Sequence, residues 1–216
     1  MRSPYPARLA PRPALGCSPR NHLPWENVTV KQARSTDRDR DSEQPVLHHV
    51  MVVGGTLAEW GALTDDQWHQ RTSVLGALAE RAGATWLTLR PFERGADVDA
   101  ARPVHHAVVG VGRCSIIVDP TPDGRERLVV ALRKLAEADQ LTEPAVAAAL
   151  LAPACAEPDL VLVLGPRDRL PTSLVWELAY AELVYLDERW ADLAPAHLDM
   201  AIDAYRQRHR RFGGLD

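Results

Sequence analysis

The segment PDLVLVLG, residues 158–165, places the strongest constraint on the fold, because it is an unbroken apolar run that ends in glycine. Such a run is typical of a parallel strand that other elements cover on both faces. A second apolar run, residues 46–53, leads directly into Gly54 and Gly55. The two runs therefore predict buried strands of a parallel sheet, the kind of sheet found in α/β proteins.

Further strands and helices alternate along the rest of the chain. Strands are predicted at residues 85–89 and 114–118, with residues 105–111 forming either another strand or a short remnant segment. Apolar spacing predicts helices at residues 65–82, 125–139, 143–152, 172–186 and 195–212. This order predicts an α/β fold with a mostly parallel central sheet flanked by helices. Ligands of such sheets bind at the carboxyl ends of the strands, so Gly54, Gly55, Asp119 and Gly165 are expected on one rim.

The first 45 residues differ from the rest of the chain. They are rich in proline and arginine and then carry a run of mixed charge, so they are predicted to form a disordered tail. A misassigned start site is the alternative interpretation. Residues 46–216 are predicted to form one domain, since this length can bury a sizeable core.

Composition limits the partners and the compartment. The 216 residues carry a formal net charge of −4, which gives no overall attraction to nucleic acid. No apolar stretch approaches the ~20 residues that span a membrane, and the N-terminus lacks the apolar region of a signal peptide. Cys17, Cys114 and Cys155 show no C-x-x-C pairing. Neither a disulfide framework nor a zinc site is indicated, so a cytoplasmic location is expected.

Spacing alone assigns little chemistry to the chain. Gly54 and Gly55 could hold a phosphate through backbone N–H groups, but they match no phosphate-loop pattern and an ordinary strand-to-helix turn is favoured. The histidine pairs at residues 48–49 and 105–106 lack the spacing of metal ligands. The ending RQRHRRFGG suits a solvated helix end or an anion site better than a nucleic-acid patch.

Two C-terminal segments, LVWELAYAELVYLDERWADL and RRFGG, resemble the cis-prenyltransferases, which include undecaprenyl and dehydrodolichyl diphosphate synthases. The family has the patterns L-W-x-x-A-Y-A-E-L and W-P-D-F, and it closes on R-R-F-G-G. The matching residues are Leu174, Trp176, Ala179, Tyr180, Ala181, Glu182, Leu183, Trp190, Asp192, Arg210, Arg211, Phe212, Gly213 and Gly214. The resemblance covers residues 46–216, patchily in the middle, and implies the cis-prenyltransferase fold.

The first motif of that family, H-x-x-x-x-M-D-G-N-x-R-W-A, is altered in this chain. When the histidine of this motif is aligned with His49, Gly55 falls at the family's aspartate, Glu59 at its arginine and Trp60 at its tryptophan. The resemblance implies that this aspartate would hold magnesium and that the arginine would bind phosphate. A carboxylate at the arginine position would instead repel a diphosphate, so the catalytic position is predicted to be lost.

Other departures concern the tunnel and the third motif. The family's long tunnel-lining helices have no room between Pro91 and Gly112, so shortened tunnel helices are expected. In the segment that the family writes R-T-G-G-E-x-R-x-S, Arg169 alone is kept. Arg169, Glu182, Trp60 and His49 are therefore the candidate site residues among the retained family positions outside the closing motif.

These losses are similar to those of the accessory subunits of two-component cis-prenyltransferases, of which the Nogo-B receptor is an example. The resemblance implies a non-catalytic subunit that donates Arg211, Phe212, Gly213 and Gly214 to the diphosphate site of a catalytic partner. The complex would make polyprenyl diphosphate from farnesyl-type diphosphate and isopentenyl diphosphate, with Mg²⁺ held mostly by the partner. Trp176, Tyr180 and Glu182, on the predicted 172–186 helix, are expected at the interface of a heterodimer or heterotetramer. Peripheral membrane association is left open.

Two alternatives remain at this stage. The chain could be a divergent active isoprenyl transferase that makes a short product, with Glu182 as a metal ligand and Glu59 or Asp119 in place of the missing aspartate. It could also be a binding or scaffold protein on the same fold.

Overall fold

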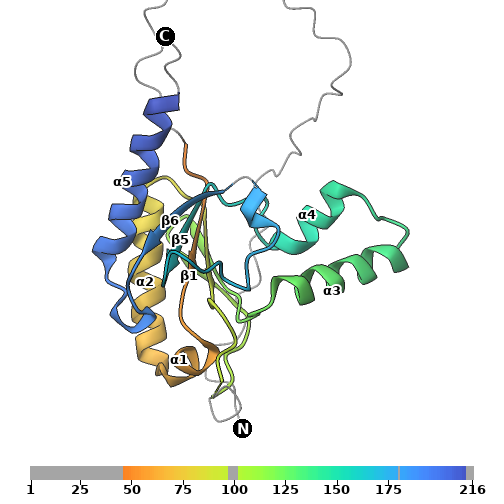
Figure 1. Cartoon of the computed structure of the whole chain (residues 1–216), viewed down its shortest axis with the longest axis horizontal. Coiled ribbons are helices and arrows are strands. Elements are labelled where there is room, and N and C mark those ends of the chain that lie inside the picture. The colour runs from red at the N-terminus through yellow and green to blue at the C-terminus, as the bar shows by residue number, and fades with distance from the viewer. Residues whose placement is uncertain (1–45, 97–101, 180, 213–216) are drawn as a thin grey trace, which may run out of the picture. The chain divides into compact units, whose positions relative to one another are not determined.

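The computed structural model describes residues 46–96, 102–179 and 181–212, and for residues 208–212 it describes the backbone only. The predicted tail, residues 1–45, lies outside the described residues, so the domain boundary stays a prediction. Figure 1 shows a central sheet with helices on both sides of it.

A six-stranded sheet with the order β3-β4-β2-β1-β5-β6 forms the centre of the domain. The strands are β1 (His49–Val53), β2 (Trp86–Arg90), β3 (Ala107–Val111), β4 (Cys114–Val118), β5 (Leu160–Leu164) and β6 (Glu182–Leu186). All neighbouring strands are parallel except β3, which pairs antiparallel with β4. The predicted α/β fold with a mostly parallel sheet is therefore confirmed.

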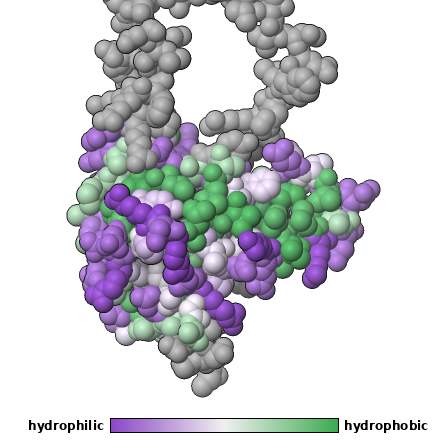
Figure 2. Space-filling model, viewed as in Figure 1, coloured by the Kyte–Doolittle hydropathy of each residue, from purple (hydrophilic) through white to green (hydrophobic). Residues whose placement is uncertain are grey.

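The helices are distributed unequally over the two faces of the sheet. Helices α1 (Leu57–Ala62), α2 (Asp65–Arg81) and α5 (Pro195–Phe212) lie on one side, whereas α3 (Gly124–Glu137) and α4 (Glu143–Leu151) project from the other side as a two-helix arm (Figure 1). Thr64 and Thr142 cap α2 and α4 through their hydroxyl groups, as expected for N-cap residues. Figure 2 shows hydrophilic residues over the α2 and α5 side and a hydrophobic band that reaches onto the arm.

Alternation along the strands divides the core between the two faces. Val50, Val52 and Leu162 pack with residues of α2 and α5. Met51 and Val163 point to the opposite face, where they pack with Phe92, Leu174 and others. All five residues of β5 are buried, which confirms that the unbroken apolar run forms a strand covered on both faces.

The helix predicted at residues 172–186 is wrong. This segment contains a 3-10 turn, Glu177–Ala179, and the edge strand β6. Its leucine, alanine and glutamate residues favour a helix locally. Pairing with β5, in which Leu160 lies opposite Glu182 and Leu164 opposite Leu186, overrides that preference.

The connection from β2 to β3 is short, and its described residues, 91–96 and 102–106, contain no helix. No helix within the described ranges is long and apolar enough to cross a membrane. Cys114 is a buried free thiol, whereas Cys155 is disulfide-bonded, so the expectation of unpaired cysteines is wrong at Cys155.

Candidate functional site

The carboxyl ends of the parallel strands meet at one rim, as predicted. The backbone N–H of Gly54 donates to Arg90 O at 3.0 Å, and that of Asp119 donates to Leu89 O at 3.0 Å. The N–H of Gly165 donates to Leu186 O at 2.9 Å. The first-motif turn, the Asp119 turn and the end of β5 are thus joined by backbone hydrogen bonds.

The turn after β1 is an ordinary strand-to-helix turn. Thr56 caps α1: Glu59 N donates to Thr56 Oγ1 at 3.2 Å, and Thr56 N donates to Glu59 Oε2 at 2.7 Å. This reciprocal pair is a capping box, so the Glu59 carboxylate is bound to its own helix terminus. Trp60, fully buried, donates from Nε1 to Gly54 O at 2.9 Å and holds the turn.

Gly55, which the sequence resemblance aligns with the family's aspartate, is packed too closely for a side chain. Its φ is +71°, in the region that favours glycine. A Cβ atom at this position would lie 2.7 Å from Trp190 Cβ. The indole of Trp190 stacks on that of Trp60 with 5.1 Å between ring centroids, so the tryptophan is itself fixed. The packed indole of Trp190 therefore occupies the space that a side chain at position 55 would need.

Four charged side chains, three of them buried and Arg127 mostly so, lie under the rim, and sequence reasoning missed them as a group. They are Arg90, Asp119, Arg127 and Glu177, here called the charge quartet. Arg90 Nε lies 2.9 Å from Asp119 Oδ2, and Arg90 Nη1 lies 2.5 Å from Glu177 Oε1. Arg127 Nη2 lies 3.0 Å from the same Glu177 oxygen, and Arg127 Nη1 lies 3.5 Å from Asp119 Oδ2. The quartet ties β2, the Asp119 turn, α3 and the segment after β5 together.

The charges of the quartet control its protonation. Burial alone would raise the pKa of Glu177, but the guanidinium groups of Arg90 and Arg127 outweigh it and lower the pKa to about 2. The pKa of Asp119 is also lowered: burial opposes the shift, and Arg90, Thr121 and Arg127 bring it about. Both acids are therefore ionised and paired, so Asp119 is not presented as a metal ligand.

Glu182 lies at the amino ends of the strands, whereas Gly55 lies at their carboxyl ends. It is the first residue of β6 and pairs with Leu160, which is also opposite Val50 near the start of β1. Gly55 follows the last residue of β1, about five residues further along the strands, which corresponds to roughly 15 Å. One chain alone therefore cannot bring Glu182 to the first-motif turn.

The last turn of helix α5 also lies near the amino ends of the strands, as Glu182 does. It runs antiparallel to the strands (Figure 1), and Arg206 near its end donates to Ala82 O, just before β2, at 3.4 Å. Burial raises the pKa of Tyr205, and the charges of Asp159 and Glu182, at the starts of β5 and β6, add to the shift. The backbone of Arg211 and Phe212 forms the end of α5, whereas Gly213 and Gly214 lie outside the described residues.

The other predicted residues have structural contacts. Trp176, expected on an interface helix, precedes the 3-10 turn, donates to Glu157 Oε1 at 3.0 Å and packs on the α3–α4 arm. Arg169 pairs with Glu93 at the rim and stacks over Phe92, with 5.3 Å from its Cζ atom to the ring centroid. Tyr180 lies outside the described residues.

His49 is a core residue rather than a site residue. It is 1% exposed, and its ring nitrogens bond Ala156 O at 2.8 Å and Thr88 Oγ1 at 2.9 Å. Burial lowers its pKa from 6.5 to about 4, with further contributions from the surrounding charges. The ring is therefore neutral at pH 7, and the carbonyl acceptor places its proton on Nδ1.

This burial predicts a pH dependence of stability. The unfolded chain binds a proton on His49 near pH 6.5 and the folded chain only near pH 4, so stability is complete above pH 6.5 and falls between these values. The total loss is expected to be about 3 kcal/mol. Urea unfolding from pH 7.5 to 4 measures it, and His49→Asn should flatten the slope in this range. An unchanged slope in the variant would contradict the assignment to His49.

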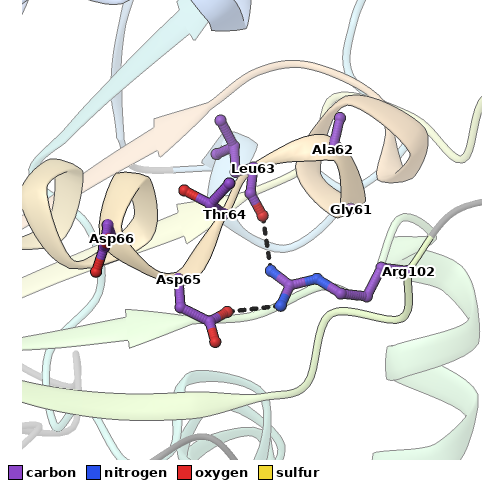
Figure 3. Close-up of a pocket in the computed structure, with 7 residues that line it drawn as sticks. All are labelled: Gly61, Ala62, Leu63, Thr64, Asp65, Asp66 and Arg102. Carbon is purple, nitrogen blue, oxygen red and sulfur yellow. Dashed lines mark hydrogen bonds and ion pairs between the residues drawn. The ribbon is translucent and has the colours of Figure 1, made fainter.

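A shallow pocket of about 430 Å³ lies at the α1–α2 turn and contains none of the rim residues (Figure 3). Arg102 closes one side of it, with Nη1 2.6 Å from Asp65 Oδ1 and Nη2 2.6 Å from Leu63 O. Within the described parts of the chain, no group of three histidine, cysteine or acidic side chains could hold a metal ion. The described residues therefore offer no cluster of three such side chains for a magnesium ion.

Comparison with known proteins identifies relatives of this chain. Residues 115–213 match the family model described as putative undecaprenyl diphosphate synthase. An isoprenyl transferase of Geobacillus kaustophilus is 32% identical over 167 residues, which are 77% of this chain and 54% of the relative. One of Brucella abortus is 38% identical over 154 residues, 68% of this chain and 56% of the relative. The chain thus spans about half the length of the curated relatives it matches.

A solved structure agrees on the fold. The probable undecaprenyl diphosphate synthase of Campylobacter jejuni superposes with a TM-score of 0.51 at 14% identity, over 76% of this chain and 97% of that one. At this identity the match concerns the fold alone. The sequence matches make residues 115–213 similar to the undecaprenyl diphosphate synthase family, the cis-prenyltransferases.

Proposed function

We propose that this chain is a non-catalytic subunit of a heteromeric cis-prenyltransferase, of the accessory kind represented by the Nogo-B receptor. The observation that carries the proposal is the packing of Trp190 against Gly55, because it excludes a side chain at the position of the family's aspartate. In this proposal a partner chain supplies that aspartate, holds Mg²⁺ and binds the isoprenyl diphosphates.

The distribution of the retained residues supports a shared site. Glu182 and the end of α5 lie at the amino edge of the sheet, whereas Gly55 and Trp60 lie at the carboxyl rim. The chain's own rim and the end of its own α5 are therefore at opposite ends of the sheet. A second chain whose rim meets the end of α5 would receive the Arg-Phe-Gly-Gly segment, and Glu182 beside it.

The closing motif suits a diphosphate chemically. A guanidinium group and glycine N–H groups donate hydrogen bonds to pyrophosphate oxygens, and fixed donors stabilise the charge that develops as the diphosphate leaves. The partner would extend a farnesyl-type diphosphate with isopentenyl diphosphate. A cytoplasmic location with access to a membrane surface is part of the proposal, because polyprenyl products are lipids.

The test is incorporation of labelled isopentenyl diphosphate with farnesyl diphosphate and magnesium. Three samples are compared: this chain, the host's paralogue that carries the D-G-N motif, and the two co-expressed. Incorporation that appears or rises strongly only with both chains supports the proposal. If the paralogue alone is equally fast, the proposed role is wrong.

Arg211→Ala is expected to lower the turnover of the complex about 100-fold while both chains still co-purify, because one preformed anion donor is lost. The matched control is Arg189→Ala, which removes an exposed arginine that pairs with Asp192 near the opposite end of the sheet. The measurement is the turnover of each variant complex at saturating substrate. Equal turnover of the Arg211 variant and wild type would rule out this use of the motif.

An active transferase with a short product is the second candidate. The relatives above are named isoprenyl transferases, and Glu182 is kept. The two acids suggested as replacements are engaged elsewhere, Glu59 in a capping box and Asp119 in the charge quartet. Incorporation by this chain alone, abolished by Glu182→Gln, would establish this candidate instead.

A further inference from the structure

The sheet has a free edge at β3, at the opposite end of the strand order from β6. β3 and β4 form a hairpin, and helix α2 holds its turn: Arg113 N donates to Glu80 Oε1 at 2.7 Å. A Cβ atom on Gly76 of α2 would lie 3.0 Å from Val111 Cβ, so the glycine lets the helix approach the hairpin closely. The free edge is therefore held in one position by the helix behind it.

The backbone groups that point outward from this edge belong to Val108 and Gly110. Ser115 N donates to Thr85 O of the chain before β2 at 2.9 Å, so Ser115 does not donate to its β3 neighbour Gly110. Bonded and non-bonded pairs alternate in an antiparallel ladder, so the pair of Val108 and Ile117 is also non-bonded. The N–H and C=O groups of Val108 and Gly110 consequently point away from β4. Within the described ranges, no other residue bonds them.

The side chains of the edge are apolar and differ sharply in size. Ala107, Val109 and Val111 pack on the core beside α2, so Val108 and Gly110 face the other side of the sheet. Val108 is 51% exposed, whereas a Cβ atom on Gly110 would meet nothing within 4 Å. A free edge is usually protected by a charge or a proline, and the sequence of β3, AVVGV, contains neither. The edge therefore offers open hydrogen-bonding groups beside one exposed valine and one open position.

We propose that β3 pairs antiparallel with β3 of a second copy of this chain, about a two-fold axis at Val109. In that register Val108 of each copy lies opposite Gly110 of the other, and the two residues exchange their outward backbone hydrogen bonds. The exposed valine of each copy then covers the open position over the glycine of the other. This self-complementarity favours a second copy over an unrelated peptide strand. The pairing is independent of the proposed function, since it leaves Glu182 and β6 uncovered.

The test is the oligomeric state of the full chain, measured by sedimentation over a range of concentrations. Wild type is expected to form a dimer with a dissociation constant in the micromolar range, because the paired edge is small. Val108→Lys brings a charge into this edge and should raise the constant about 100-fold or more. Its control is Val46→Lys, at another exposed valine, which should leave the constant unchanged.

A second variant, Val108→Pro, tests whether the backbone makes the contact. The N–H that proline lacks is one that points away from β4, so the hairpin keeps its own hydrogen bonds while the outward pairing is blocked. This variant should also lose the dimer. In wild type, the amides of Val108 and Gly110 should become protected from hydrogen exchange as the dimer forms.

The contrary outcomes are distinct. A wild type that is monomeric at about 100 μM would overturn the proposal. So would a dimer that either Val108 variant retains, that Val46→Lys also abolishes, or in which the amides of Val108 and Gly110 stay unprotected, because the copies would then meet through another surface. Incorporation of labelled isopentenyl diphosphate tests the proposed function separately from all of these results.

Discussion

Glu177→Ala is expected to lower the free energy of unfolding by about 3–5 kcal/mol, because it leaves two buried guanidinium groups without their shared carboxylate. The Glu177 side chain is fully buried, and Arg90 and Arg127 bind the same oxygen at 2.5 and 3.0 Å. Urea unfolding at pH 7 measures the loss. Asp192→Asn is the control, since its ion pair with Arg189 is exposed and should change stability by less than about 1 kcal/mol.

A paired replacement tests whether the loss comes from unpaired charge. Replacing Glu177 and Arg90 together by methionine removes one partner of each sign and should cost clearly less than the two single changes added together. The charge quartet also predicts acid sensitivity. Its Glu177 pKa is lowered from 4.5 to about 2, so its contribution is complete above pH 4.5 and falls as the pH drops toward 2. Additive losses in the paired variant would contradict the coupling.

Strands and helices could be predicted from the sequence where their burial requires a regular pattern of apolar residues. β5 is apolar at every position because both of its faces are covered, and α5 shows its apolar spacing over 18 residues. β6 could not be predicted, because the residues ELVYL also suit a helix and only the free edge of β5 requires a strand there. The strand alternative for residues 105–111 is confirmed by β3, whose antiparallel direction follows from its hairpin with β4.

Individual residues of the candidate site could be identified in the sequence, but their arrangement in space could not. The glycine at position 55 was visible in the sequence, but its packing against Trp190 joins residues 135 positions apart. The charge quartet joins Arg90 and Glu177, 87 positions apart, and neither belongs to a motif. No residue pattern shows that Glu182 and Gly55 lie at opposite ends of the strands. That placement depends on the register of β5 against β1 and β6.

Restoring the family's acid by Gly55→Asp is expected to destabilise the chain by roughly 4 kcal/mol instead of restoring activity. The positive φ costs about 1–3 kcal/mol for a residue with a side chain, and overpacking against Trp190 adds about 1–3 kcal/mol. Gly55→Ala should lose nearly as much, which would show that packing rather than charge is the cause. Glu59→Gln, which keeps the capping box and removes the neighbouring charge, is the control and should change stability little.

The measurement is urea unfolding of the three variants, with isopentenyl diphosphate incorporation assayed beside it. A stable Gly55→Asp variant that incorporates label on its own would mean that Trp190 moves aside and that the rim still forms a catalytic site. A destabilised and inactive variant would mean that loss of the acid and packing of the tryptophan are one structural change. The chain could then gain catalysis only by losing core contacts, which would give a physical reason for the proposed dependence on a partner.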